Sequence, residues 1–155
     1  MLIRDAKITE GYEIEALVKL CAKDSEGMMI TPEEAYGRIS KATISKSTHI
    51  KVVEIDKKIV GVVLGSMGMT KSTYHNMELA MCVHPDVRNI GLGTNLMDIF
   101  VNEFSYFNLF ANVSESNSLI IKLLKGLNFK EVGRIPKGLK EKEGYKDKLI
   151  MFYYG

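Results

Sequence analysis

The chain has 155 residues and a formal net charge of +2, which fits one domain and lacks the strongly basic character typical of nucleic-acid-binding proteins. Hydrophobic residues make up 46% of the sequence, a share that supports a folded core and excludes a disordered chain. No run of about 18 apolar residues occurs, so no membrane-spanning helix is expected. Arg4, Asp5 and Lys7 interrupt the apolar stretch that a signal peptide needs. We therefore predict a single domain over residues 1–155 in the cytoplasm, with no nucleic-acid or membrane partner.

The first half of the chain is predicted to hold a strand, two helices and a hairpin. Ile14, Leu17 and Cys21 recur at helical spacing and define one face of the first helix. Thr31 followed by Pro32 starts the second helix, because Thr caps a helix and Pro suits its first position. The predicted elements are strand 1–8, helix 12–23, helix 31–45, and strands 49–55 and 59–66 joined at Asp56-Lys57-Lys58.

The second half alternates strands and helices. The strand 78–83 is apolar on both faces, which is typical of a central strand, and it stops before Pro85, which cannot donate to a sheet ladder. Helices are predicted at 94–107 and 118–127, and strands at 109–113, 129–134 and 148–154. Helices interspersed among strands predict an α/β fold with a mixed sheet and helices on its faces.

The two cysteines, Cys21 and Cys82, lie far apart in the sequence, and neither belongs to a Cys-x-x-Cys pair. We predict that each is a small buried hydrophobic side chain in a reducing compartment, and that the chain has no disulfide scaffold. The histidines at positions 49, 75 and 84 lack the spacing of metal ligands. We therefore predict no metal site.

The segment between the central strand and the next helix contains Arg88, Gly91 and Gly93. Two glycines let backbone N–H groups converge where a helix begins, and the helix dipole adds positive potential. Arg88 adds a donor that carries charge. The pattern favours a pyrophosphate cradle, with an ordinary tight loop as the alternative. A G-x-G-x-x-G dinucleotide fingerprint would need Gly at Leu96, and no Gly-Lys-Ser/Thr of a Walker A loop follows.

Three segments carry a resemblance to a known family. Arg88-Asn89-Ile90-Gly91-Leu92-Gly93 resembles the R/Q-x-x-G-x-G/A signature of the GCN5-related N-acetyltransferases (GNAT superfamily). Asn117 together with residues 123–129 is similar to the family's N-x-x-A-x-x-L-Y-E-K-x-G-F segment, and residues 144–151 are similar to its G-Y-x-D-x-x-x-M ending. The order of predicted elements also resembles that family along nearly the whole chain.

The resemblance implies a GNAT-like α/β fold, with a mostly antiparallel sheet of about six or seven strands, about four flanking helices, and central strands splayed to admit coenzyme A. It implies transfer of an acetyl group from acetyl-CoA to a primary amine of a small molecule, by direct attack in a ternary complex. It also allows a homodimer, since relatives commonly dimerise. The implied cofactor-binding residues are Met81, Cys82, Val83, Arg88, Asn89, Ile90, Gly91, Leu92, Gly93, Thr94 and Asn117.

The reaction requires a proton acceptor, because an alkyl amine with a pKa of about 10 is mostly protonated at neutral pH. The resemblance implies Glu78 as this base, and the alternative is a solvated glutamate at a strand end. Many relatives use a Tyr to protonate the leaving thiolate where this chain has Leu124. Tyr145 is the predicted substitute, with Tyr153 as a second choice and packing as the alternative role for both. Leu124 also leaves open a non-catalytic acyl-CoA-binding module, and the acceptor amine is not specified by the sequence.

Overall fold

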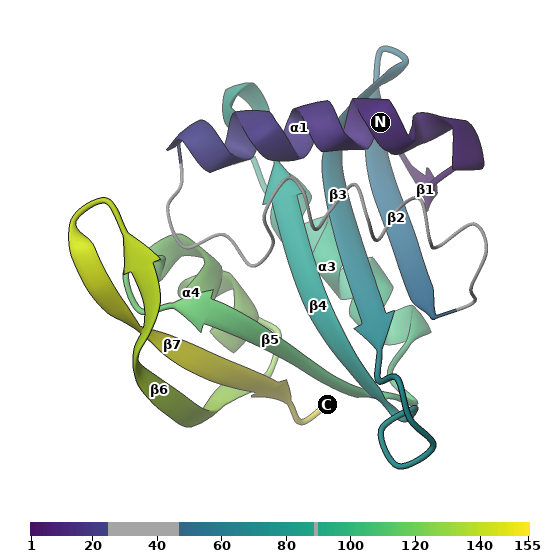
Figure 1. Ribbon diagram of the computed structural model, residues 1–155. Coiled ribbons are helices and arrows are strands. Elements are labelled where there is room, and N and C mark those ends of the chain that lie inside the picture. Colours follow the sequence, from purple (N-terminus) through teal and green to yellow (C-terminus); the bar gives the residue numbers. More distant parts are fainter. Residues whose placement is uncertain (25–46, 89) are drawn as a thin grey trace.

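The computed structural model describes residues 1–24, 47–88 and 90–155, and the labels below follow Figure 1. Within these residues, seven strands form one sheet in the order β1-β2-β3-β4-β5-β7-β6. Neighbouring strands are antiparallel except for the parallel pair β4–β5. The strands are β1 (Leu2–Asp5), β2 (Thr48–Ile55), β3 (Lys58–Met67), β4 (Asn76–Val83), β5 (Asn108–Ser114), β6 (Phe129–Glu141) and β7 (Gly144–Tyr153).

One face of the sheet is covered by α1 (Gly11–Asp24), which follows a short 3-10 turn at Ile8–Glu10. The apolar stripe predicted for this helix is buried, with Ile14 and Val18 fully inaccessible to solvent. The stripe packs on side chains of β2, β3 and β4, among them Val62 and Ala80. Burial of this stripe is what anchors α1, since helices in globular proteins are stabilised mainly by packing of an apolar face.

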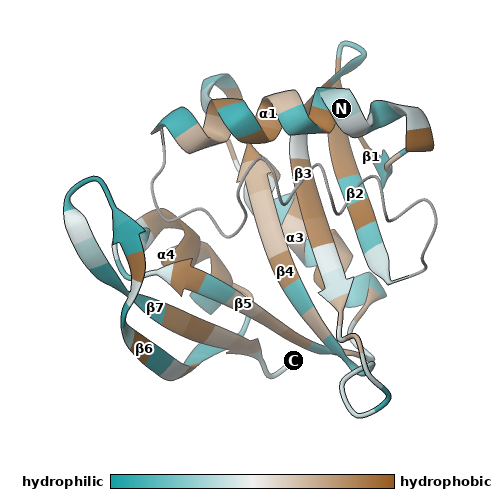
Figure 2. Cartoon of the chain, viewed as in Figure 1, coloured by the Kyte–Doolittle hydropathy of each residue, from teal (hydrophilic) through white to brown (hydrophobic). Residues whose placement is uncertain are grey.

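The opposite face is covered by α3 (Leu92–Glu103) and α4 (Ser118–Gly126). Figure 1 shows α3 behind β3 and β4, and α4 beside β5. Phe100 of α3 and Leu124 of α4 belong to one continuous core cluster, and both are fully buried. Hydrophobic residues follow the central strands, whereas the tip of the β6–β7 hairpin is hydrophilic (Figure 2).

The strands β4 and β5 diverge after a short paired section. Their parallel pairing covers only Asn76 with Asn108, Met77 with Leu109, and Glu78 with Phe110. By contrast, β4 stays paired with β3 along its whole length, as far as Val83. The sheet therefore opens between β4 and β5, and the opening widens toward the carboxyl end of β4 (Figure 1).

The predicted α/β fold with a splayed, mostly antiparallel sheet is confirmed, and the differences concern element ends. The helix predicted at 94–107 spans 92–103, and the strand predicted at 129–134 continues to Glu141. β6 and β7 thus form a longer hairpin than the sequence indicates. Their outer halves are polar, with β6 largely exposed and β7 mostly half-buried, so they carry no apolar alternation that would predict a strand. The helix predicted at 31–45 lies outside the described residues.

Candidate active site

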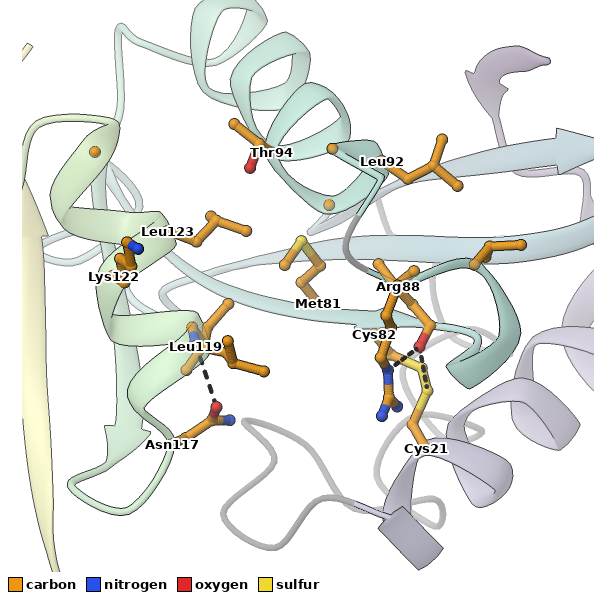
Figure 3. A pocket seen from close by; sticks show the side chains of 16 residues that line it. Cys21, Met81, Cys82, Arg88, Leu92, Thr94, Asn117, Leu119, Lys122 and Leu123 are labelled. Carbon is orange, nitrogen blue, oxygen red and sulfur yellow. Dashed lines mark hydrogen bonds between the residues drawn. A yellow bond between two sulfur atoms is a disulfide. The ribbon is translucent and has the colours of Figure 1, made fainter.

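A cavity of about 450 Å³ lies where β4 and β5 separate. Its wall comes from four parts of the chain: the end of α1, the end of β4, the loop leading into α3, and α4 (Figure 3). The lining residues are Cys21, residues 81–83, Val87, Arg88, residues 91–94, Asn117, Leu119, Ile120, Lys122, Leu123 and Gly126. Apolar side chains thus line the gap, and a glycine-containing helix start closes one end.

The loop before α3 owes its shape to two glycines with different roles. Gly91 is the N-cap of α3 and has φ of +84°, a conformation that costs other L-residues roughly 1–2 kcal/mol. A Cβ atom at Gly91 would meet nothing within 4 Å, so the space beside it is open. The first intrahelical hydrogen bond is donated by Asn95 to Gly91. The N–H groups of Leu92, Gly93 and Thr94 therefore have no acceptor within the helix and can serve an anion.

Gly93 is required by close packing. A Cβ atom there would lie 3.4 Å from side-chain atoms of Leu123, Met81 and Val83. That distance leaves room for one methyl group and for nothing larger. Gly93 therefore brings the start of α3 against both α4 and β4, and keeps the cavity between them narrow.

Arg88 lies in the cavity wall, where its guanidinium Nε donates to the carbonyl oxygen of Val83 at 2.9 Å. This bond fixes the side chain against the end of β4 (Figure 3). The remaining guanidinium N–H groups can donate to a phosphate, since Arg carries five such donors.

The backbone of β4 presents hydrogen-bonding groups to the opening. His84 N–H donates to Val60 of β3, so the residues that bond to β3 are those of even number, in keeping with antiparallel alternation. The backbone groups of Met81 and Val83 therefore face away from β3, toward the gap that β5 has left. An extended amide-containing chain could pair with them as an added strand does.

Cys21 and Cys82 form a disulfide with their Cα atoms 6.4 Å apart, within the usual range for such a bond. The prediction of two separate buried thiols was wrong in this respect, although both side chains are indeed buried, at 2% and 5% exposure. Packing of α1 on β4 brings the two residues together across 61 positions of sequence. The helical stripe places Cys21 on the core side of α1, but the sequence does not specify which strand that side contacts.

Glu78 lies on β4 at the point where the sheet opens, because it is the last β4 residue paired with β5. Side chains alternate along a strand, so Glu78 shares the α1 face of the sheet with Ala80 and Cys82. It does not line the cavity itself. Tyr145 is 61% exposed and pairs with Lys140 in the β6–β7 hairpin, away from the cavity wall.

Asn117 and α4 form the other side of the cavity. The side chain of Asn117 caps α4 by accepting a hydrogen bond from Ile120 N–H at 3.3 Å, and it also lines the cavity. Leu124, which stands where many relatives have a Tyr that protonates the leaving thiolate, is fully buried in the core. Its neighbour Leu123 lines the cavity.

One of the predicted cofactor-binding residues does not line the cavity: Ile90 is 67% exposed outside it. Asn89 is not among the described residues. The sequence prediction missed Leu119, Lys122, Leu123 and Gly126, which line the cavity from α4. Lys122, Leu123 and Gly126 follow Leu119 by three, four and seven positions. This spacing is the signal that could have identified them, since it places residues on one helix face.

A second cavity lies at the carboxyl end of α3, lined in part by Glu103 and by residues of β1 and β2. Lys51 Nζ lies 2.8 Å from an oxygen of Asp5 and 2.6 Å from an oxygen of Glu103. Burial alone would lower the pKa of Lys51, but the hydrogen bonds to these carboxylates raise it overall. Burial lowers the pKa of the neighbouring His49. The cation is thus neutralised by its own neighbours, and the cluster serves to join β1, β2 and α3.

Among residues 1–24, 47–88 and 90–155, no group of three or more His, Cys, Asp or Glu side chains could hold a metal ion. No helix within the same residues is long and apolar enough to cross a membrane.

Comparison with known families and structures agrees with this geometry. The family model for the Acetyltransferase (GNAT) domain matches residues 46–131, which is more than half of the chain. No curated protein matches the sequence. A ribosomal-protein-alanine N-acetyltransferase from Brucella melitensis has a similar fold, with a TM-score of 0.86, 18% identity, and 100% of both chains covered.

Two further solved structures resemble the chain. The protein smu.2055 from Streptococcus mutans UA159 is 27% identical, with a TM-score of 0.82 and coverage of 99% of this chain and 98% of that one. The putative acetyltransferase yncA from Salmonella typhimurium, solved with its cofactor acetyl-CoA, is 16% identical with a TM-score of 0.85. The alignment covers 98% of this chain and 92% of that protein. At 16% identity, the likeness to yncA concerns the fold alone.

Proposed function

Because the chain belongs to the GNAT acetyltransferase family, we propose that it transfers an acetyl group from acetyl-CoA to a primary amine of a small molecule. The observation that carries this proposal is the single cavity wall that joins the Gly91–Gly93 loop to the opening between β4 and β5. A phosphate-binding end and a slot lined by strand backbone are what a ligand with a pyrophosphate and a pantetheine arm requires.

The residues present fit acetyl-CoA in three ways. The unpaired N–H groups at the start of α3 and the Arg88 guanidinium suit the pyrophosphate. The backbone groups of Met81 and Val83 suit the amides of the pantetheine arm, which would add to β4 as an extra strand. Gly93 lets the start of α3 pack close to Leu123, Met81 and Val83, which gives the arm an apolar wall.

Acetyl-CoA supplies an activated thioester, and the chain has to position the amine and accept its proton. Glu78 stands at the fork of β4 and β5 and faces the α1 side, where an acceptor could approach. Its carboxylate would accept the proton directly or through water, a role that contributes typically 10²–10⁴-fold to a rate. A backbone N–H group of an odd-numbered β4 residue would polarise the thioester oxygen, because these groups face the opening whereas the Cys82 N–H is directed to β3.

The leaving thiolate has no hydroxyl donor at position 124, because Leu124 is apolar and fully buried. A thiol with a pKa of about 8.5 can leave as the thiolate with little assistance. The transfer therefore does not depend on an acid at this position, and the role of Tyr145 remains a hypothesis. A cytoplasmic location and a single domain over residues 1–155 are part of the proposal.

Turnover on a panel of amines tests the proposal. Acetyl-CoA and the protein are incubated with polyamines, amino acids and aminoglycosides, and the release of free thiol is followed. We expect steady release with at least one amine class, and a decrease of at least about 100-fold in Glu78→Gln. The matched control is Glu143→Gln, which changes an exposed glutamate in the turn between β6 and β7, away from the fork of β4 and β5.

Two results would separate the alternatives. Saturable acetyl-CoA binding with no turnover on any amine would favour the non-catalytic module that Leu124 leaves open. Unchanged turnover in Glu78→Gln would support the enzymatic function but exclude Glu78 as the base.

A further inference from the structure

Two cationic side chains line the cavity assigned to acetyl-CoA. Among the described residues of its wall, Arg88 and Lys122 carry a charge, and none is acidic. Arg88 suits the pyrophosphate, which leaves Lys122 without a role. We propose that Lys122 binds the 3′-phosphate on the ribose of acetyl-CoA, and so makes the protein select this donor over its dephosphorylated form. The inference rests on the proposed function, since it requires acetyl-CoA in this cavity.

Lys122 and Arg88 lie on opposite walls of the cavity. Arg88 follows β4 and is held there by its hydrogen bond to the carbonyl oxygen of Val83, whereas Lys122 belongs to α4. Figure 3 shows the two side chains on either side of the cavity. A ligand between these walls therefore meets a cation on each side, and two separate anionic groups can be divided between them.

Packing of α4 against α3 brings Lys122 close to the anion-binding loop. A Cβ atom at Gly93 would lie 3.4 Å from a side-chain atom of Leu123, the residue that follows Lys122. Leu119, Lys122 and Gly126 all line the cavity, and their spacing places them on one face of α4. The flexible four-carbon stem of a lysine on this face can carry its charge to a group that extends from the pyrophosphate.

The charge of Lys122 is not neutralised by its neighbours. Within the described part of the chain, no acidic side chain pairs with Lys122. Lys51 of the second cavity, by contrast, has Asp5 and Glu103 as partners. A cleft whose charged groups share one sign attracts ligands of the opposite sign, so the cation of Lys122 is available to an anionic ligand.

Acetyl-CoA carries two separate anionic groups. Its pyrophosphate links the pantetheine arm to the ribose, and a phosphate monoester is attached to the 3′-oxygen of that ribose. The N–H groups at the start of α3 and the Arg88 guanidinium already supply donors for the pyrophosphate. The 3′-phosphate needs a cation of its own, and Lys122 is the second cation that the described cavity wall offers.

The exposure of Lys122 agrees with a position at the nucleotide end of the ligand. Lys122 is exposed although it lines the cavity, and so is Leu119 one turn before it. The pantetheine arm would run from the start of α3 along β4 toward Glu78, which leaves the ribose at the outer end. The compact, hydrated charge of an ammonium suits a phosphate that stays in contact with water.

Calorimetry with two acetyl donors tests the proposal. Acetyl-CoA and acetyl-dephospho-CoA differ only in the 3′-phosphate, and both are titrated into the protein without an acceptor amine. We expect the wild type to bind acetyl-CoA about 3- to 10-fold more tightly, since an exposed charge pair contributes modestly. Lys122→Met should remove this preference and leave the affinity for acetyl-dephospho-CoA unchanged. Added salt should reduce the wild-type preference, because it screens exposed charges.

Two further variants separate a contact made by Lys122 from a general effect of charge. Lys122→Arg should retain the preference, because it keeps a positive charge on a long side chain. Lys125→Met is the matched control, since Lys125 is an exposed lysine of the same helix that does not line the cavity. This control should retain the preference as well. The thermal midpoints of all variants without ligand check that the fold is unchanged.

Four results would overturn the proposal and leave the proposed function intact. Equal wild-type affinities for the two donors would show that the 3′-phosphate is not recognised. A preference that survives in Lys122→Met would assign the recognition to another residue, and one that is lost in Lys125→Met would assign it to the overall charge of α4. An equal loss of affinity for both donors in Lys122→Met would place Lys122 at the pyrophosphate. Absence of binding of either donor to the wild type would instead overturn the proposed function as well.

Discussion

Reduction of the Cys21–Cys82 disulfide is expected to lower the thermal unfolding midpoint of the protein. The bond closes a loop with a sequence separation of 61 residues. In the chain-entropy model, closing such a loop removes roughly 14 cal/mol/K from the unfolded state, which corresponds to about 4 kcal/mol at 25 °C. For a chain of this size each kcal/mol corresponds to roughly 2–4 °C, so the midpoint should fall by on the order of 8–16 °C.

The assay compares oxidised protein with the same protein in a phosphine reductant, by circular dichroism with thiols counted in both samples. The loop-entropy reasoning assigns the difference to the unfolded chain, with the folded contacts of α1 on β3 and β4 kept after reduction. The Cys21→Ala/Cys82→Ala variant is the matched control, and its midpoint should not respond to the reductant. A difference below about 2 °C in the wild type, with the thiol counts confirming reduction, would refute the loop-entropy reasoning.

Further variants test the cavity, the α4 cap and one ion pair. Gly93→Ala should keep acetyl-CoA binding because one methyl group fits at 3.4 Å, whereas Gly93→Val should lose it; calorimetry that finds equal affinities would contradict the packing argument. Asn117→Ala should cost about 1 kcal/mol of stability through loss of the helix cap, and Asn117→Asp should retain it, as measured by urea unfolding. Hydrogen bonding from Arg4 lowers the pKa of Glu10, so Glu10 contributes stability above its unfolded pKa of about 4.3 and the contribution is lost as pH falls through the folded value. The difference in midpoint between the wild type and Glu10→Gln should therefore be present at neutral pH and disappear in acid, and a constant difference would exclude this linkage.

Much of the fold was predictable because its signals are local. The stripe of Ile14, Leu17 and Cys21 predicted α1, and the turn at Asp56-Lys57-Lys58 predicted the β2–β3 hairpin. In the structure the turn is Asp56 and Lys57, with Lys58 already in β3. Both turn residues have positive φ, as a tight hairpin turn requires. The length of β6 was underestimated, since a polar strand on a sheet edge has no apolar alternation to mark its end.

The candidate site was predictable only in part, because it depends on which elements meet. Arg88, Gly91 and Gly93 lie close together in the sequence and carry a local signal for an anion-binding loop. All three line the cavity. Cys21 and Cys82 carry no such signal. Their bond results from the packing of α1 on β4, a tertiary contact that residue spacing does not encode.

The central claim is that the loop before α3 binds acetyl-CoA, and the thermal unfolding midpoint with and without this ligand tests it most directly. A ligand at about 100 times its dissociation constant stabilises a protein by roughly 2.7 kcal/mol, which predicts a rise on the order of 5–10 °C for this chain. The rise should vanish in Gly91→Glu, which adds bulk and negative charge where the pyrophosphate would lie. Gly91→Ala should lower the ligand-free midpoint, because a φ of +84° strains an L-residue by roughly 1–2 kcal/mol, but it should retain a rise with acetyl-CoA because it adds only a methyl group. A wild-type midpoint that does not change at millimolar acetyl-CoA would contradict the account, and would leave the Gly91–Gly93 segment as an ordinary loop.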